Sequence, residues 1–308
     1  LEKRRHGSKI NTDHVIKIVK DIKTNKQKAL IKYEKKFSKN SKIKPSKKEI
    51  NNSIKSLDPK IKNAIDFAFS RILKFHSLQK INNIKYTDKL NNKIEYKYIP
   101  IQSVGIYVPH NLPSTLLMNA ILAKKIVGVK RVVLANPRLN GKLNPAVMYA
   151  AKKCGISEII NASGSQAIAS LAYIQKVNKI VGPGNDFVAR AKKQVFGDVG
   201  IEGMVAGPSE ITVVADKNTN LKEVLTSLIG QAEHDPNSQC ILVSNNKNFI
   251  KSFQKNLKNE LNKIPRKNIA KKSLLRNGLI IRVYNNKQIV DSINEIAPEH
   301  LELNLKNL

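Results

Sequence analysis

Two short polar motifs in the second half of the sequence carry residue types that can bind a metal or move protons. The first is "QAEHDPNSQ", in which Gln231 and His234 lie three positions apart. On a helix this spacing places both side chains on one face. Histidine is a common zinc ligand and glutamine an unusual one, and two ligands do not complete a zinc site. The same pair is also typical of a polar helix end before Pro236.

The second motif is "APEHLEL", in which Glu299 directly precedes His300. A carboxylate beside an imidazole can divide acid and base roles near neutral pH. Adjacent residues on a helix point in different directions, so a bend after Pro298 would help both side chains reach one pocket. The alternative is the start of a surface helix, where proline often precedes acidic residues.

Two glycine-containing motifs are typical of loops that precede helices. In "SGSQ", Ser163 to Gln166, backbone N–H groups at a helix start would face an anion. "GPGN", Gly182 to Asn185, is typical of a tight turn before a helix capped by Asn185. Each motif also fits a simple helix cap, and neither by itself predicts a dinucleotide site.

The elements that must position these motifs alternate between strands and helices from about residue 104 onward. Strands are expected at "VGIYVP", "KRVVLANP", "EIINA" and "KIVGPG", and again at "ITVVAD", "QCILVSN" and "GLIIRVYN". Repeated β–α alternation with short loops predicts parallel sheets with helices on both faces. In such sheets ligands bind outside the carboxyl ends of the strands, and we expect the polar motifs there, "AGPSE" and "AEHDPNS" included.

The predicted fold class is α/β, with two Rossmann-like, doubly wound parallel-sheet units and an N-terminal helical segment. The helical periodicity extends from residue 11 to about 79, and "KIEYKYIPI" then alternates as a strand does. We predict a discontinuous domain of residues 1–106 and 209–308, which carries Gln231 and Glu299. Residues 107–208 would form an inserted Rossmann-like domain.

Composition limits the class of protein and its partners. The 308 residues are 41% hydrophobic and carry a net charge of +32. Lysines are spread along the sequence without clusters of arginine and aromatic residues, so we expect solvated lysine faces and no nucleic-acid partner. No apolar run approaches the ~18 residues of a membrane span, and no signal peptide is visible, so we expect a cytoplasmic protein with no membrane partner. Cys154 and Cys240 form no CxxC motif, which favours buried packing.

Taken together, these motifs resemble the histidinol dehydrogenase family. The resemblance covers essentially the whole chain in the same order, through "GIYVP", "PSTLLMNAILAKKIVGVKRVVLANP", "SGSQAIASLAY", "KIVGPGNDFVARAKKQVFG", "AGPSEI", "QAEHDPNSQ" and "APEHLEL". It implies a zinc- and NAD-dependent oxidoreductase that converts L-histidinol to L-histidine through L-histidinal, the last step of histidine biosynthesis. Two successive hydride transfers, each to one NAD, would accomplish the oxidation.

The resemblance also implies roles for individual residues. Glu299 and His300 would be the catalytic pair, in which Glu299 activates water on the aldehyde and His300 accepts protons. Gln231 and His234 would ligate zinc and contact the substrate. Ser209 would be a further substrate contact.

For the cofactor, the resemblance implies that Tyr107, Gln166 and Asn185 bind NAD. Residues 107–208 are therefore the expected NAD-binding domain. The sequence departs from the family after "YVP", where His110 replaces a glycine and the loop is shorter. This departure falls at the NAD end of the expected pocket.

The family's remaining zinc ligands, an aspartate and a histidine, lie beyond its "PEHLE" segment, and its C-terminal piece reaches the neighbouring active site of an intertwined homodimer. The sequence begins without methionine and ends eight residues after His300. We therefore expect a fragment that is inactive in isolation, with a naturally short gene product as the alternative.

Two other functions are alternatives to histidinol oxidation. One is a related zinc- and NAD-dependent dehydrogenase that acts on another polar alcohol. The other is a non-catalytic protein that binds nucleic acid through its +32 charge. Such a protein would bind DNA or RNA with a steep salt dependence.

Overall fold

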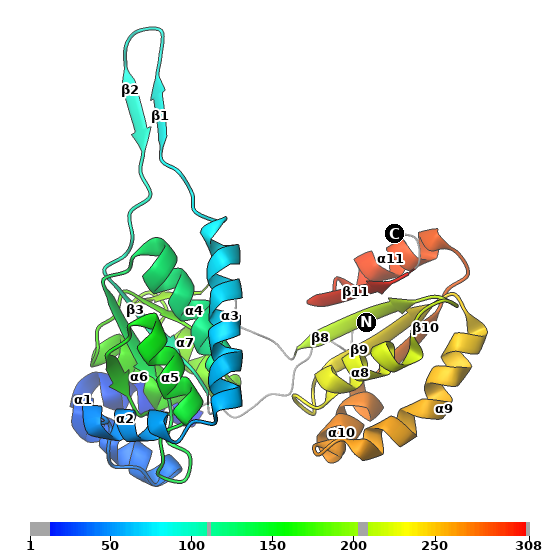
Figure 1. Ribbon diagram of the computed structural model, residues 1–308, viewed down its shortest axis with the longest axis horizontal. Coiled ribbons are helices and arrows are strands. Elements are labelled where there is room, and N and C mark those ends of the chain that lie inside the picture. The colour runs from blue at the N-terminus through cyan, green and yellow to red at the C-terminus, as the bar shows by residue number, and fades with distance from the viewer. Residues whose placement is uncertain (1–12, 110–111, 203–208, 306–308) are drawn as a thin grey trace. The chain divides into compact units, whose positions relative to one another are not determined.

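The computed structural model describes residues 13–109, 112–202 and 209–305. Helices and strands alternate along most of the chain and form two compact units, one within residues 10–205 and one within residues 206–308 (Figure 1). Both units contain a parallel sheet with helices on both faces, which confirms the predicted α/β fold class.

A five-stranded parallel sheet forms the centre of the 10–205 unit. Its strands, in the spatial order β5-β4-β3-β6-β7, are β3 (Ser103–Tyr107), β4 (Arg131–Ala135), β5 (Glu158–Ile160), β6 (Lys179–Val181) and β7 (Gly200–Ile201). Every residue of β3 is buried, as expected of a central strand covered on both faces. The strand order reverses between β3 and β6, which makes this position the topological switch point of the sheet.

Helices cover both faces of this sheet. They are α1 (Asp13–Ser38), α2 (Lys47–Lys55), α3 (Pro59–Ser77), α4 (Pro113–Ala120), the π-helix η2 (Ile121–Val127), α5 (Pro145–Cys154), α6 (Gly164–Tyr173) and α7 (Asp186–Val195). Helices α1, α6 and α7 share one hydrophobic cluster with the sheet, and α3, α4 and α5 share the other. The predicted cap of α7 by Asn185 is present, and in addition the Asp58 side chain caps α3 and Gly155 ends α5 in the left-handed conformation.

The N-terminal helices pack in the 10–205 unit, which differs from the predicted grouping of residues 1–106 with residues 209–308. Helix α1 packs against α6 and α7, and α3 packs against α4 and α5. A parallel sheet needs an apolar cover on each face, and these helices supply it. Hydrophobic periodicity shows which face of a helix is buried, but it does not show which sheet that face covers.

A four-stranded parallel sheet forms the 206–308 unit. Its strands, in the order β10-β9-β8-β11, are β8 (Glu210–Ala215), β9 (Gln239–Ser244), β10 (Leu279–Arg282) and β11 (His300–Asn304). Its helices are α8 (Leu221–Ala232), α9 (Lys247–Lys263), α10 (Lys267–Asn277) and α11 (Asn286–Ile296). Helices α8, α9 and α10 share a cluster with Val213 and Leu242, whereas α11 packs with Val214 and Val243 on the opposite face.

An antiparallel hairpin extends from the 10–205 unit beyond the end of α3 (Figure 1). It consists of β1 (Ile84–Thr87) and β2 (Lys93–Tyr96), with Ile84 opposite Tyr96 and Tyr86 opposite Ile94. Every residue of both strands is exposed. The sequence predicted the second strand of this hairpin but not the first.

Both cysteines are free and buried, as the sequence predicted. Burial raises the pKa of each thiol, of Cys154 and of Cys240, to about 11, so neither is a reactive thiolate at neutral pH. Among the described residues, no helix combines the length and the apolar character needed to cross a membrane.

Truncation of Leu30 tests whether α1 is an integral part of the 10–205 unit. Leu30 is fully buried in the cluster that α1 shares with α6, so Leu30→Ala should lower the free energy of unfolding by about 2–5 kcal/mol. Ile16→Ala is the matched control, because Ile16 lies on the same helix with 45% of its surface exposed and should change stability far less. Urea unfolding of the 308-residue chain measures both, and equal losses would contradict this packing of α1.

Candidate functional site

The predicted zinc and catalytic residues lie at the amino edge of the 206–308 sheet, and the predicted location of "AGPSE" and "AEHDPNS" at its carboxyl edge was wrong. Ser209 directly precedes β8, the segment containing His234 leads into β9, and Glu299 directly precedes β11. The starts of parallel strands share one edge of a sheet. "QAEHDPNS" and "APEHLEL" each follow a helix and precede a strand, so they belong to the amino edge.

Glu299 is anchored by the neighbouring strand. Its Oε2 accepts a hydrogen bond from the backbone N–H of Glu210 at 3.1 Å, and its Oε1 lies 3.9 Å from Nε2 of His300. His300 begins β11 opposite Ile211, so a strand and not a helix follows this motif. The side chains of Glu299 and His300 are 41% and 59% exposed. The pair is therefore held at the sheet edge and reaches solvent.

Gln231 lies in the last turn of α8, and His234 follows the end of that helix. The N–H of His234 donates to the carbonyl of Gln231 at 3.2 Å, which continues the helical path by one turn. Gln231 is half-buried and His234 is exposed. The Nε2 atom of Gln231 is buried and has no hydrogen-bond partner among the described residues. Rotation of the amide would place its oxygen acceptor at the same position.

These residues fit part of a zinc site. His234 offers an imidazole and Gln231 an amide oxygen, whereas a zinc site takes four ligands, of which a catalytic one receives three from the protein. Within the part of the chain that the structure describes, no group of three or more His, Cys, Asp and Glu side chains could hold a metal ion. Gln231 and His234 would therefore supply two ligands of a zinc ion.

Ser209 is half-buried, and its carbonyl accepts a hydrogen bond from the N–H of Gln239 at 3.0 Å. This bond ties the segment before β8 to the first residue of β9. The other part of the "AGPSE" motif, residues 206–208, lies outside the described residues, as does His110.

In the 10–205 unit, the predicted cofactor residues lie at the carboxyl edge of the sheet, where the sequence placed their motifs. Tyr107 is the last residue of β3, Gln166 lies in the first turn of α6, and Asn185 caps α7. Tyr107 ends β3 and Gly182 follows β6, and these two strands flank the switch point. This is the position at which sheets of this kind bind their ligands.

A buried carboxylate occupies the amino end of α6. Oε1 of Glu34 accepts hydrogen bonds from the backbone N–H of Ser163 at 2.7 Å, from Nε2 of Gln166 at 2.9 Å and from the Ser163 hydroxyl at 3.1 Å. The Tyr107 hydroxyl accepts a bond from the N–H of Gly164 at 3.2 Å. The protein's own carboxylate and phenol thus fill positions that the "SGSQ" motif could otherwise offer to an anion.

Sequence reasoning missed Glu34, although a signal was present. Glu34 follows Leu30 by four residues, so it falls on the apolar stripe of α1, where an acidic residue is out of place. It has no exposed surface, and burial raises the pKa of its carboxyl while the hydrogen bonds from Ser163 and Gln166 oppose that rise. Burial also raises the pKa of Tyr107, which keeps its phenol neutral.

The "GPGN" loop makes a close backbone contact with β3 and is hydrogen-bonded to a half-buried ion pair. Gly182 has φ of 109°, and a Cβ atom there would lie 2.1 Å from the carbonyl oxygen of Tyr107. Its carbonyl accepts a bond from Nζ of Lys192 at 2.5 Å, and its N–H donates to Oε2 of Glu202 at 3.1 Å. Lys192 and Glu202 also form an ion pair, and the Lys192 side chain is 5% exposed. Only glycine fits this position.

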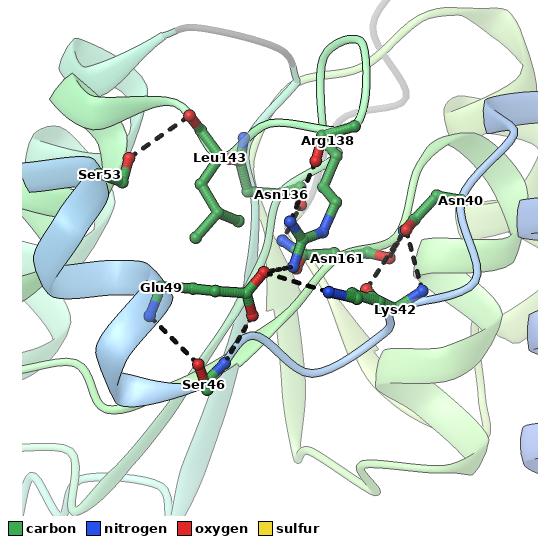
Figure 2. A network of polar contacts seen from close by, with 10 residues as sticks. Asn40, Lys42, Ser46, Glu49, Ser53, Asn136, Arg138, Leu143 and Asn161 are labelled. Atoms are coloured by element: carbon green, nitrogen blue, oxygen red, sulfur yellow. Dashed lines mark hydrogen bonds and ion pairs between the residues drawn. The ribbon is translucent and has the colours of Figure 1, made fainter. Parts of the chain in front are cut away.

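A second polar network connects α2 to the carboxyl ends of β4 and β5 (Figure 2). The Arg138 side chain is 5% exposed and donates to Oε1 of Glu49 at 3.1 Å. Asn161 donates from Nδ2 to the carbonyl of Asn136 at 3.1 Å, and Asn136 donates to the carbonyl of Val108 at 2.9 Å. Protein groups thereby occupy the ends of β4 and β5, beside the predicted cofactor residues.

Comparisons with known proteins agree with the sequence resemblance. A family model described as "Histidinol dehydrogenase" matches residues 1–308. The histidinol dehydrogenase of Pelagibacter ubique is 57% identical over 314 residues, which cover 100% of this chain and 73% of the relative. Histidinol dehydrogenase 1 of Trichormus variabilis is 42% identical over 254 residues, which cover 80% of this chain and 58% of that protein. The crystal structure of histidinol dehydrogenase from Elizabethkingia anophelis superposes with a TM-score of 0.91 at 36% identity, covering 98% of this chain and 72% of the other.

Substitution of Gly182 tests the close approach of the "GPGN" loop to β3. Gly182→Ala should destabilise the chain by more than the ~1–2 kcal/mol that a left-handed conformation costs a residue with a Cβ, because the methyl group also overlaps the Tyr107 carbonyl. Gly128→Ala is the control, since Gly128 has φ of 81° but nothing within 4 Å of its Cβ position. Urea unfolding compares them, and a smaller loss for Gly182→Ala would contradict the contact.

The buried carboxyl of Glu34 predicts a pH dependence of stability. Its pKa is higher in the folded than in the unfolded state, so the wild-type chain loses stability as pH rises from the unfolded pKa through the folded one. The glutamine side chain of Glu34→Gln does not titrate. Its Oε1 can still accept the hydrogen bond from Ser163, and its NH₂ group takes the position of Oε2, which accepts no hydrogen bond in the wild-type chain. The stability of Glu34→Gln relative to wild type should therefore increase between about pH 4 and pH 7.

Glu49→Gln is the matched control, because the trend should have the opposite sign. A backbone hydrogen bond from Ser46 lowers the pKa of Glu49, so the wild-type chain gains stability from this group as pH rises through its unfolded value. Thermal unfolding of the three proteins between about pH 2 and pH 7 measures both trends, because the Glu49 trend lies mostly below its unfolded pKa and the Glu34 trend above it. Parallel trends for Glu34→Gln and Glu49→Gln would show that burial does not govern the ionisation of Glu34.

Proposed function

This chain belongs to the histidinol dehydrogenase family, and from that membership we propose that it acts in the oxidation of L-histidinol to L-histidine through L-histidinal, the last step of histidine biosynthesis. The observation that carries the proposal is the match of the whole chain to the family, with 57% identity to a relative of which it covers 73%. The proposed setting is the cytoplasm, with the active protein a homodimer.

The paired residues at the amino edge of the 206–308 sheet suit the two oxidation steps. Bound NAD would accept one hydride in each step. In the first step, His300 would take the hydroxyl proton of the alcohol, and the product is the aldehyde. In the second, Glu299 would take a proton from the water that adds to the aldehyde, and His300 would take the hydroxyl proton of the hydrate as the acid forms. The Glu210 N–H holds one oxygen of Glu299 at 3.1 Å, which leaves the other oxygen to face water.

Gln231 and His234 would hold zinc as two of its ligands, and Ser209 would contact the substrate beside them. Bound zinc would polarise the oxygen of the alcohol and of the aldehyde. The protein's contribution is to keep Gln231 and His234 one helical turn apart through the 3.2 Å hydrogen bond between their backbones.

The 10–205 unit would bind NAD, with the residues that do so confined to the predicted 107–208 domain. Tyr107, Gln166 and Asn185 lie at the carboxyl edge of its sheet, where such folds bind dinucleotides. Glu34 accepts the hydrogen bond from Nε2 of Gln166, and the Ser165 hydroxyl donates to Oε1 of that amide at 3.5 Å, so one lone pair of Oε1 would be left to accept from the cofactor.

Glu299→Gln separates the two oxidation steps in the active protein that contains this chain. Oxidation of L-histidinol to the aldehyde should remain within about tenfold of wild type, whereas oxidation of supplied L-histidinal should slow by about 10²–10⁴-fold, because only the second step needs a base for water. Single-turnover formation of NADH from each substrate measures both steps. Glu295→Gln, an exposed residue of α11, is the control and should change neither.

Equal loss of both steps in Glu299→Gln would contradict the role of Glu299 as the base for water. A wild-type protein that oxidises another polar alcohol but not L-histidinol would contradict the proposed substrate.

A further inference from the structure

The strands of the 10–205 sheet lie in the order that is typical of dinucleotide-binding sheets. Numbered as they occur in the chain, they form the order 3-2-1-4-5, in which β4 is the second strand. In such sheets the carboxyl end of the second strand meets the adenosine ribose of the cofactor. A carboxylate there binds the ribose hydroxyl of NAD, whereas an arginine nearby accommodates the 2′-phosphate of NADP. We therefore expect the groups at the end of β4 to discriminate between the two cofactors.

The segment that follows β4 carries an arginine and has no carboxylate of its own. Strand β4 ends at Ala135, which lies opposite Tyr107 of β3, and the sequence "NPRLNGK" follows as residues 136–142. Arg138 is the charged residue closest to the strand in this segment. Taken by itself, this segment would favour the phosphate of NADP over the ribose hydroxyl of NAD.

Glu49 of α2 brings a carboxylate to this place from another part of the chain. Its Oε1 accepts a hydrogen bond from Arg138 at 3.1 Å, and its Oε2 accepts one from the Ser46 N–H at 3.0 Å (Figure 2). Nζ of Lys42 lies 3.9 Å from the same Oε1. The Ser46 N–H lowers the pKa of Glu49, so the carboxylate is charged at neutral pH. Because its side chain is 35% exposed, this fixed carboxylate can still accept a hydrogen bond from a ligand.

Arg138 has little capacity to bind a phosphate while it is paired with Glu49. Its side chain is 5% exposed, and its terminal nitrogens donate to Oε1 of Glu49 and to the carbonyl of Gly141, each at 3.1 Å. Its Nε atom is buried and has no hydrogen-bond partner among the described residues. A guanidinium binds a phosphate best through two of its N–H groups at once. The contact with Glu49 therefore occupies a group that such a phosphate would need.

We propose that Glu49 determines the choice of cofactor: its carboxylate accepts a hydrogen bond from the adenosine ribose of NAD and, through its pairing with Arg138, excludes the 2′-phosphate of NADP. The inference rests on the proposed binding of NAD by the 10–205 unit. The extra phosphate of NADP would meet the negative charge of Glu49 and a guanidinium whose terminal nitrogens are already bonded. Without this carboxylate, Arg138 and Lys42 would form a purely cationic site, which favours a phosphate.

Glu49→Gln in the active protein that contains this chain tests the proposal by binding alone. Glutamine can replace glutamate in the capping box that Glu49 forms with Ser46, so the amino end of α2 is preserved. The affinity for NADH should fall about tenfold and that for NADPH should rise about tenfold, because a charged hydrogen bond is lost in the first case and a charge repulsion in the second. Titration followed by the fluorescence of the reduced nicotinamide measures both dissociation constants without turnover.

Glu158→Gln is the matched control, because it removes an ion pair of the same kind from the opposite edge of the same sheet. Glu158 begins β5 and pairs at 2.8 Å with Arg131, which begins β4. This variant should change neither dissociation constant. Arg138→Gln in the Glu49→Gln background then isolates the guanidinium, and it should cancel the gain for NADPH while the loss for NADH remains.

Three results overturn the proposal and leave dinucleotide binding by the 10–205 unit intact. They are an unchanged ratio of the two dissociation constants in Glu49→Gln, the same change of that ratio in Glu158→Gln, and a wild-type protein that binds NADPH as tightly as NADH. A gain for NADPH that persists in the double variant overturns the part assigned to Arg138. A wild-type protein that binds neither dinucleotide contradicts the proposed function itself, and this inference with it.

Discussion

The hydrogen bonds of one buried carboxylate join the N-terminal helices to the part of the fold that carries the predicted cofactor residues. Glu34 extends from α1 to the amino end of α6, where it accepts bonds from the Ser163 N–H and from Gln166. A helix amino end has unpaired N–H groups and a positive partial charge, which makes it one of the few places where a carboxylate can be buried. Helix α1 therefore sets the orientation of Gln166 as well as covering the sheet.

The predicted site residues of the two units lie at opposite edges of their parallel sheets, and the helix dipoles differ between those edges. At the carboxyl edge of the 10–205 sheet, Glu34 and Tyr107 occupy the amino end of α6, whereas the amino end of α7 would favour anionic groups such as those of a dinucleotide. At the amino edge of the 206–308 sheet, α8 and α11 end just before the segments that carry His234 and Glu299. Their carboxyl ends favour cations, which agrees with the zinc ligands proposed there.

Local signals in the sequence were sufficient for the fold class and for the helix caps. Asp58 and Gly155 act through neighbours in the sequence, so their roles can be predicted without tertiary contacts. The roles of Glu34 and of the segment at His300 depend on distant partners: Ser163 for the first, and β8 for the second. The packing of α1 also depends on a partner that is distant in the sequence, because an apolar stripe fits any apolar sheet face.

The electrostatics of this protein depend on a few fixed carboxylates more than on its large positive charge. The chain has 55 basic and 23 acidic residues, and its lysines are mostly solvated. Four glutamates instead accept backbone N–H groups at turns or element starts, through the pairs Glu34–Ser163, Glu49–Ser46, Glu202–Gly182 and Glu299–Glu210. Each bond fixes a carboxylate relative to the backbone, so its charge acts at a defined place, whereas a solvated lysine is mobile and screened. The net charge of the chain therefore does not describe these four carboxylates, each of which is fixed by a backbone hydrogen bond.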